Sequence, residues 1–404
     1  MYLSDMVYFA TNRPPGADGK YRGLYPDDGP ILFRVGHGVV KEKREWNDPN
    51  DSYALSLDSL ETFFEAPRNQ KTGSEPVLGS KELFSELQGR MRREKRDLLI
   101  YIHGFANTFK SAMERARQLQ DYWGPVVDQS RPLEKVPEDD RCITLAVCWP
   151  SDGKVFSGFS PYAAYHDDRH DAELSGLAIA RMFDAFQRHI ATCDPAALCN
   201  QKIHLVAHSM GVFALTHAVR RLRRIGAVQP RALIFDTAFL MAGDDEDDVL
   251  SDKERLAPLT GLSRRIYAYH SLQDLAVWKA ASVIGGPRIG YRGPRDFNTL
   301  PDNVISVDCS RVSRSDRGEE AAHQYYRTRA EVLRDVQQVL AEVPDAEIQG
   351  RRADPTRPRR FLIEDDERLH QESVFGSGSR SSGRRRRDAR GRYQSFDADE
   401  GATS

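Results

Sequence analysis

The chain has 404 residues, of which 40% are hydrophobic, so it can bury a large core in one big domain or in two smaller ones. Its 58 Lys and Arg residues face 60 Asp and Glu residues, and the net charge of -2 gives no general attraction to nucleic acid or to an anionic membrane. Such a partner would need a local patch of charge.

The five cysteines are odd in number and irregularly spaced, which does not indicate a disulfide framework. The first residues lack the basic start and long apolar centre of a signal peptide, and no run reaches the ~18 apolar residues of a membrane span. We therefore expect a soluble protein of the cytoplasm.

Residues 1–90 alternate short extended runs, such as MVYFAT and ILFRVG, with turns rich in Pro and Gly. This pattern predicts antiparallel strands at the edge of a sheet. Beyond residue 95 the pattern changes, and apolar runs of strand length recur with helical segments between them. These runs are 98–103, 143–149, 203–208, 232–242, 265–270 and 304–309.

Each of these runs is apolar almost throughout, as a parallel strand covered on both faces requires. Between them, residues 168–190 and 323–340 repeat apolar positions with the 3.6-residue period of a helix. The alternation predicts an α/β fold with a doubly wound, mostly parallel sheet and antiparallel N-terminal strands. We expect one domain over residues 1–345, with edge strands in 1–90 and the core in 95–340.

The composition changes after residue 345, and we assign residues 346–404 to a C-terminal extension. From about residue 370 the chain is rich in Arg, Ser and Gly with almost nothing to bury, which predicts a disordered tail. The run Arg384 to Arg387 could hold phosphate or RNA, but a short basic run in a tail is usually only solvated. Nucleic-acid binding by the tail is therefore the less favoured interpretation.

The stretch IHLVAHSMGVFAL ends an apolar strand at a serine and continues as a helix. A serine on such a turn projects its Oγ atom from the carboxyl edge of the sheet, and the Met210 amide points to where an oxyanion would form. Ala207 and Gly211 are small, as the close approach of strand and helix requires, although the usual pattern has glycine at both positions. We predict Ser209 as a nucleophile and His208 as a supporting residue; the alternative is a buried serine at an ordinary turn.

A second oxyanion donor is expected after an earlier strand, where LLIYIHGFANTF passes from a strand through a loop into a helix. Gly104 lets the backbone turn so that the Phe105 amide faces the serine, and Asn107 or Thr108 lies near the start of the helix. His103 precedes the serine, whereas the base of this arrangement comes last in the chain. We therefore interpret His103 as a structural histidine, hydrogen-bonded under the loop.

The acid and the base should follow the serine in that order, each beyond a later strand. Asp274 follows the strand RIYAYH, and His323 follows the loop after VISVDC, so we predict them as the acid and the base. Asp236 lies inside an apolar run and is interpreted as a core acid. His270 ends a strand but precedes Asp274, so it suits the base less well.

The acidic run DDEDD, residues 244–248, follows a strand and could bind a divalent cation. Such a run is more often a solvated loop with a helix cap, which is the interpretation that we favour. We accordingly predict no metal and no cofactor.

Together these motifs resemble the DUF900 group of uncharacterised bacterial α/β-hydrolases. The resemblance covers residues 95–340 through IYIHGFANTF, CWPSDG, YHDDRHDAELSG and IHLVAHSMG, and VYFATNRPP is similar to the ATxR start of those proteins. It implies a single α/β-hydrolase domain in which Ser209, Asp274 and His323 match the nucleophile, the acid and the histidine. The DDEDD run matches the family's aspartate-bearing segment only loosely, and the Arg-rich tail lies outside the resemblance.

The favoured hypothesis is a serine hydrolase that cleaves an ester or related acyl bond of a small molecule through an acyl-enzyme. The alternatives are an acyltransferase or amidase with the same triad, or a non-catalytic interaction scaffold with this fold. Segments 150–168, 243–263 and 275–302, the last with Trp278 and Tyr291, are expected to shape the acyl pocket. The sequence indicates neither the substrate nor the oligomeric state.

Overall fold

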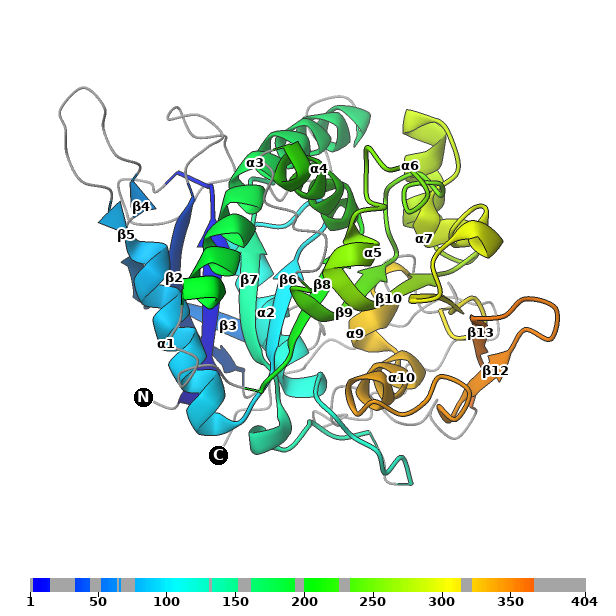
Figure 1. The fold of residues 1–404 in the computed structure, drawn as a ribbon, viewed down its shortest axis with the longest axis horizontal. Coiled ribbons are helices and arrows are strands. Elements are labelled where there is room, and N and C mark those ends of the chain that lie inside the picture. Colours follow the sequence, from blue (N-terminus) through cyan, green and yellow to red (C-terminus); the bar gives the residue numbers. More distant parts are fainter. Residues whose placement is uncertain are drawn as a thin grey trace, which may run out of the picture.

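The structure is a computed structural model of the chain, drawn as a ribbon in Figure 1. It describes residues 3–14, 33–43, 52–63, 65–66, 77–130, 133–151, 161–192, 200–224, 233–313 and 322–366. None of the helices in these ranges combines the length and the apolar character needed to cross a membrane.

An 11-stranded sheet runs through the molecule in the order β12-β13-β11-β10-β9-β8-β6-β7-β1-β2-β3. Its middle strands are parallel, whereas β2, β3 and β12 run antiparallel to their neighbours at the two ends. The predicted α/β architecture with antiparallel N-terminal strands is confirmed. The strands are β1 (Met6–Thr11), β2 (Arg34–Glu42), β3 (Tyr53–Phe63), β6 (Leu98–Ile102), β7 (Ile143–Cys148), β8 (Ile203–His208), β9 (Phe235–Met241), β10 (Ser263–His270), β11 (Val304–Asp308), β12 (Arg351–Ala353) and β13 (Arg360–Ile363), with a separate pair β4 (Glu65–Ala66) and β5 (Val77–Leu78).

Helices lie on both faces of this sheet (Figure 1). The α-helices are α1 (Gly79–Glu94), α2 (Phe109–Tyr122), α3 (Pro161–Thr192), α4 (Met210–Arg224), α5 (Leu259–Leu262), α6 (Leu275–Ile284), α7 (Ile289–Arg292), α9 (Tyr325–Thr328) and α10 (Ala330–Leu340). The short 3-10 helices are η1 (Leu3–Asp5), η3 (Glu138–Asp140) and η5 (Phe297–Thr299). The segment 323–340, expected as one helix, is divided at Arg329 into α9 and α10.

Strand β6 is apolar throughout because its successive side chains enter two different cores. Leu98, Ile100 and Ile102 pack on the face that α1, α3 and α4 cover. Leu99 and Tyr101 pack on the opposite face, which α2 and α10 cover. Burial on both faces explains why the strand lacks the alternation of polar and apolar residues seen in strands with one wet face.

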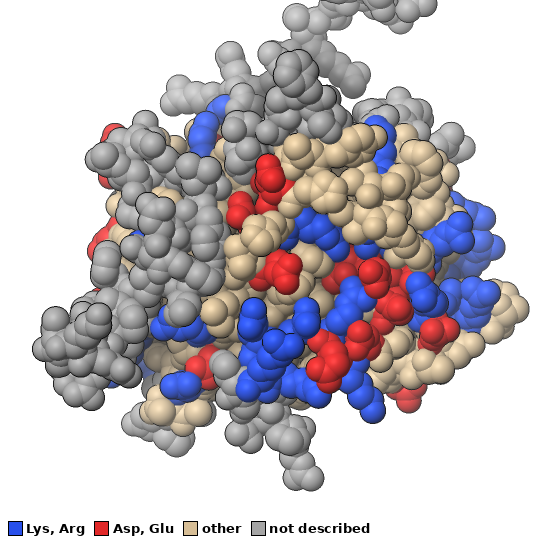
Figure 2. All heavy atoms as spheres, turned by 90° about the horizontal axis from the view of Figure 1, so that it is seen from above, with Lys and Arg blue, Asp and Glu red and all other residues tan. Residues whose placement is uncertain are grey.

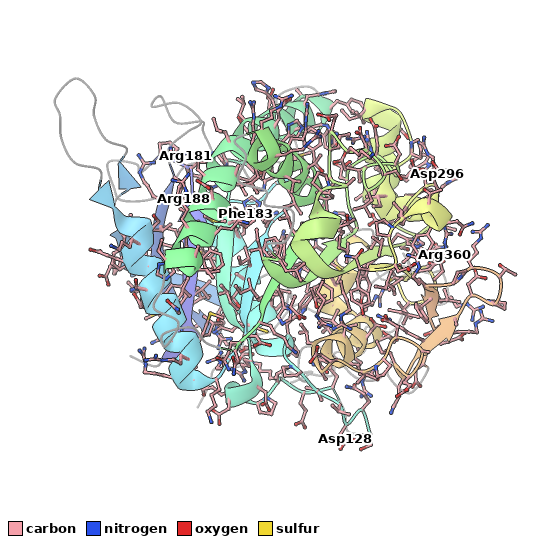
Figure 3. The ribbon with its side chains drawn as sticks, in the orientation of Figure 1. Asp128, Arg181, Phe183, Arg188, Asp296 and Arg360 are labelled. Atoms are coloured by element: carbon pink, nitrogen blue, oxygen red, sulfur yellow. The ribbon has the colours of Figure 1, made fainter. Side chains whose placement is uncertain are left out.

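In its C-terminal half, helix α3 carries Phe183 toward the sheet and Arg188 outward (Figure 3). Phe183 is 1% exposed, and its ring centroid lies 5.5 Å from that of Phe235 on β9. On the solvent side, Arg188 forms an ion pair with Asp184 one helical turn away. The 3.6-residue period of the sequence thus corresponds to one buried stripe on the helix.

The C-terminal extension contributes the last two strands of the sheet. Strand β13 pairs in parallel with β11, and β12 pairs antiparallel with β13. Arg351 of β12 is tied to α10, because its guanidinium donates to the Asp335 carboxylate at 2.5 and 2.8 Å. The extension that follows residue 345 is therefore bound to the sheet as far as residue 363. The tail expected from about residue 370 lies outside the described residues.

Candidate active site

Ser209 occupies the turn between β8 and α4 in a left-handed backbone conformation with φ of +55°. Few residues other than glycine adopt this conformation, and it is held by backbone bonds on both sides. The Ser209 amide donates to the Met241 carbonyl at 2.9 Å, and the Asp244 amide donates to the Ser209 carbonyl at 3.0 Å. The turn is thus fixed to the end of the neighbouring strand β9.

The small residues around the serine are required by close backbone contacts. A Cβ atom on Gly211 would lie 2.5 Å from the Ile102 carbonyl oxygen and 2.6 Å from that of His103. Ala207 is fully buried and pairs with Ile102 across β8 and β6. The alanine that replaces the usual glycine is therefore accommodated, whereas the position of Gly211 has no room for a side chain.

The HGF loop after β6 lies against the serine. A Cβ atom on Gly104 would lie 2.8 Å from the Ser209 Cβ atom, so these two residues are in direct contact. His103 beneath the loop is fully buried, and its ring stacks on Trp149 with the centroids 4.9 Å apart. Its ring nitrogens lie 2.9 Å from the Gly104 carbonyl and 3.2 Å from the Trp149 carbonyl.

Burial lowers the pKa of His103 to about 3, so the imidazole is neutral near pH 7. A neutral ring has one N–H and can donate to only one of these two carbonyls. The Trp149 indole also donates to the His103 carbonyl at 2.8 Å, which fixes the start of the loop to the end of β7. His103 is therefore placed to support the loop rather than to accept a proton from the serine.

Arg13, which sequence reasoning did not select as a site residue, secures the loop from the far side. It is fully buried at the end of β1, and its guanidinium donates to the Asn107 carbonyl at 2.7 Å and to the Ser151 carbonyl at 2.9 Å. The Asn107 side chain in turn donates to the carbonyls of Gly104 and Phe105, each at 2.9 Å. These contacts give a structural reason for the arginine in VYFATNRPP. The cap of α2 is Thr108, whose hydroxyl accepts from the Ser111 amide.

The two amides predicted as oxyanion donors lack hydrogen-bond partners among the described residues. Met210 is the first residue of α4, where helix amides have no partner within the helix. Neither the Phe105 amide nor the Met210 amide makes a hydrogen bond within the described part of the chain. Together with the helix dipole, these amides favour negative charge next to the serine.

Asp274 and His323 are brought together although 49 positions separate them in the chain. The Nδ1 atom of His323 lies 2.8 Å from Oδ2 of Asp274. The other carboxylate oxygen accepts the Val277 amide at 3.1 Å and so caps helix α6. Asp274 is fully buried. Because each of its carboxylate oxygens has a hydrogen-bond partner, the orientation of the carboxylate is fixed.

His323 lies beside the serine turn through its contact with His208. The Nε2 atom of His208 lies 3.2 Å from the His323 carbonyl oxygen, and the two ring centroids are 4.6 Å apart. His208 is buried, stacks on Tyr326 and has a pKa well below its usual range because of burial. The Ser209 hydroxyl makes no hydrogen bond within the described residues, so its bond to a base is not formed here. Such bonds often form only when substrate is bound.

The alternative acid and base have other partners. The Nε2 atom of His270 lies 3.1 Å from the Ser306 hydroxyl, and burial lowers the pKa of His270 to about 4. Asp236 accepts two hydrogen bonds from Arg264, at 2.7 and 2.9 Å, at the start of β9. Both residues are thus engaged in structural contacts.

The expectation of a solvated loop at residues 244–248 is wrong. Asp244 and Asp245 are buried, and arginines outside the run form ion pairs with it. Arg255 pairs with Asp245, and it also contacts Glu246 at 2.8 Å and Asp248 at 3.1 Å. Within the described ranges, no group of three potential ligands could hold a metal ion.

Of the segments expected to shape the pocket, residues 152–160 lie outside the described part of the chain. Trp278 on α6 is 48% exposed, and Leu272, just before Asp274, is exposed to the same extent. Tyr291 instead packs against the core under α2 and α10. The apolar surface beside Asp274 therefore comes from Trp278 and Leu272.

A view from above the molecule of Figure 1 shows Lys and Arg side chains interspersed with Asp and Glu side chains on its described part (Figure 2).

The model of one protein family, described as an α/β-hydrolase of unknown function (DUF900), matches residues 80–342. No curated protein and no solved structure matches the chain.

Proposed function

We propose that this chain, which belongs to the DUF900 family of α/β-hydrolases, is a serine hydrolase that cleaves an ester or related acyl bond. Ser209 would be the nucleophile, His323 the base and Asp274 the residue that orients the base. The observation that carries the proposal is the 2.8 Å contact between His323 and the buried Asp274, beside a serine with a positive φ. The small-molecule acyl substrate and the cytoplasmic location expected from the sequence stay predictions.

In the first half of the reaction, Nε2 of His323 takes the hydroxyl proton while Oγ of Ser209 bonds to the acyl carbon. The Asp274 carboxylate accepts a hydrogen bond from Nδ1–H of the ring, so that Nε2 is the free acceptor and the resulting imidazolium is stabilised. When the tetrahedral intermediate collapses, the acyl–oxygen bond to the leaving alcohol breaks and the imidazolium returns the proton to that alcohol. The acyl group stays on Ser209.

In the second half, water takes the place of the alcohol. His323 removes one proton from the water, the hydroxide oxygen bonds to the acyl carbon, and the acid leaves as the serine recovers its proton. In both halves the negative oxygen would be stabilised by the amides of Phe105 and Met210. Removal of one such donor typically lowers the rate by ~10² to 10³.

Labelling with a fluorophosphonate probe tests this proposal, because the probe forms a stable adduct only with an activated serine. The wild-type protein should be labelled and Ser209→Ala should not. Ser175→Ala is the matched control, since Ser175 is also buried but its hydroxyl accepts a hydrogen bond from Asn12. Labelling that persisted in folded Ser209→Ala protein would overturn the assignment of the nucleophile.

A substrate panel then distinguishes the reaction types. Unlabelled wild-type protein is offered esters, amides and acceptor alcohols. The products then distinguish ester hydrolysis from amide cleavage and from acyl transfer. Accumulation of an acyl adduct on Ser209, detected by intact mass with a slowly released ester, is expected for every one of these reactions. Turnover without such an adduct would exclude the covalent mechanism.

A further inference from the structure

Three side chains at the start of α3 lie on one face of that helix. Tyr165, Asp168 and Arg169 are spaced i, i+3 and i+4, which places them above one another. They belong to the YHDDRHD segment, for which the reaction described above has no role. Asp168 and Tyr165 contact the loop that carries the Phe105 amide, and Tyr165 and Arg169 contact Asp244, which in turn binds the turn before Met210.

Asp168 holds the first of these segments. Its Oδ2 atom accepts the Ala106 amide at 3.1 Å and a hydrogen bond from the Ser151 hydroxyl, and the side chain is 1% exposed. Ala106 directly follows Phe105 and has a φ of +56°, a conformation that costs ~1 to 3 kcal/mol and requires support. Asp168 therefore fixes the strained residue Ala106, and this restricts the direction of the adjacent Phe105 amide.

Tyr165 holds the second segment through the acidic loop. Its hydroxyl donates to Oδ2 of Asp244, whose own backbone amide donates to the Ser209 carbonyl at 3.0 Å. The Tyr165 ring also packs edge to face on Phe105, with the centroids 5.6 Å apart. Tyr165 thus contacts Phe105, which bears the first donor, and Asp244, which fixes the Ser209 turn before the second donor, Met210.

Arg169 completes the arrangement. Its guanidinium donates to the Asp244 carbonyl at 3.2 Å and to the Tyr165 hydroxyl at 3.4 Å. Burial raises the pKa of Asp244, while Arg169 and Arg288, whose Nε atom lies 3.5 Å from Oδ1, act in the opposite direction. The pKa of Tyr165 is raised by burial and by Asp244, so its hydroxyl remains a donor at neutral pH.

We propose that Tyr165, Asp168 and Arg169 are positioning residues that set the Phe105 and Met210 amides at the spacing an oxyanion requires. This inference rests on the proposed function, because it assigns these residues to the same site. Rate depends steeply on such geometry, and a shift of about 1 Å can lower it by about 100-fold. A helix that clamps both segments therefore acts on the reaction without touching the substrate.

The test compares Tyr165→Phe and Asp168→Asn with two controls outside the segments expected to shape the pocket. Tyr53→Phe removes a hydrogen bond from a tyrosine hydroxyl to the Asp121 carboxylate, and Asp139→Asn changes an exposed carboxylate in η3. Each variant is assayed for kcat and KM with a short aryl ester and for inhibition by an alkyl boronic acid, which forms a tetrahedral adduct with a serine nucleophile. Circular dichroism and thermal unfolding show whether each variant is folded.

We expect kcat to fall about 10- to 100-fold in Tyr165→Phe and Asp168→Asn, with KM nearly constant, because the oxyanion exists only in the transition state. The inhibition constant of the boronic acid should rise in proportion to the loss of kcat/KM. A loss of stability alone would not produce this proportionality. Both controls should match the wild-type protein.

Wild-type kcat in both folded variants would overturn the inference, as would a loss of kcat with unchanged boronic acid inhibition. If Ser209→Ala is inactive in the same assays, the proposed function stands while the inference fails. If Ser209→Ala keeps the activity, or if the wild-type protein has none, the proposed function fails and the inference falls with it.

Discussion

The carboxylate of Asp274 contacts His323 with one oxygen and caps the N-terminus of helix α6 with the other. The two contacts measure 2.8 Å to Nδ1 of His323 and 3.1 Å to the Val277 amide. The orientation of the proposed base is therefore coupled to the capping of a helix. Substitutions at residue 274 can separate these two roles, since asparagine caps helices about as well as aspartate and alanine does not.

Asp274→Asn is expected to lower kcat by about 10³- to 10⁴-fold while leaving the free energy of unfolding almost unchanged. The asparagine side chain keeps the helix cap. Its NH2 group, however, can donate a hydrogen bond to Nδ1 of His323 and so favour the tautomer with the proton on Nε2, which cannot act as the base. Asp274→Ala should lose as much activity and, in addition, about 1 kcal/mol of stability. Steady-state kinetics and urea unfolding measure the two effects. Wild-type kcat in Asp274→Asn would contradict the role of this carboxylate.

Gly104→Ala is expected to remove activity in a protein that still folds. The new Cβ atom would lie 2.8 Å from the Ser209 Cβ atom and 3.0 Å from the His208 carbonyl oxygen, so the HGF loop must move. Displacing the Phe105 amide should lower kcat by about 10² to 10³, the usual effect of losing one oxyanion donor. The measurement is kcat with a short ester, together with fluorophosphonate labelling.

Gly89→Ala is the matched control for this change. A Cβ atom there meets only the end of the flexible Arg93 side chain at 3.1 Å, on the helix α1. It should keep wild-type kcat and gain about 0.5 to 1 kcal/mol of stability, because alanine suits a helix interior better than glycine. Equal activity in the two variants would show that the loop beside Ser209 tolerates displacement.

The sheet could be predicted from the sequence because a strand buried on both faces appears as a continuous apolar run. Every one of the six apolar runs became a strand, from β6 to β11, since a strand covered twice needs apolar residues at each position. Strands β12 and β13 were missed for the opposite reason. Their residues RRA and RFLI are only partly buried, and Arg351 takes its place through an ion pair with Asp335 rather than through apolar burial.

The site could be predicted only where its residues lie in local motifs. The turn around Ser209 is specified within five residues, so the positive φ of Ser209 and the crowding at Gly211 agree with the motif. The burial of Asp245 depends on Arg255, and the loop contacts of Arg13 depend on segments more than 90 positions away. No periodicity or local spacing in one sequence records such pairs.

Replacing Ser209 should reveal the strain stored in the serine turn. At a φ of +55°, glycine is unstrained whereas alanine keeps the steric conflict between Cβ and the backbone. Ser209→Gly is therefore expected to exceed Ser209→Ala in stability by about 1 kcal/mol, with both variants inactive. At Ser175, inside α3, the order should be reversed by about 1 kcal/mol. Urea unfolding gives the free energies of unfolding of the four variants. The same order of glycine and alanine stability at both positions would contradict the backbone strain at Ser209.

The buried histidines predict that the protein loses stability in mild acid. The pKa of His103 is about 3 in the folded chain against 6.5 in the unfolded chain, so between these values only the unfolded state binds the proton. Stability therefore falls as pH decreases below 6.5, by up to about 1.4 kcal/mol per pH unit for this one group. From pH 7 to pH 5 the loss from His103 alone should be about 2 kcal/mol.

His103→Asn isolates this contribution, because asparagine does not titrate in this range. Urea unfolding at pH 5, 6 and 7 should give a free energy that declines with acid less steeply in the variant than in the wild type, by close to one proton. Between pH 7 and 8 the two slopes should differ much less, since the unfolded state then loses only about 0.2 proton from His103 and the folded state none. Identical slopes from pH 7 to 5 would mean that His103 takes up its proton in the folded chain, and the neutral support of the HGF loop would then be wrong.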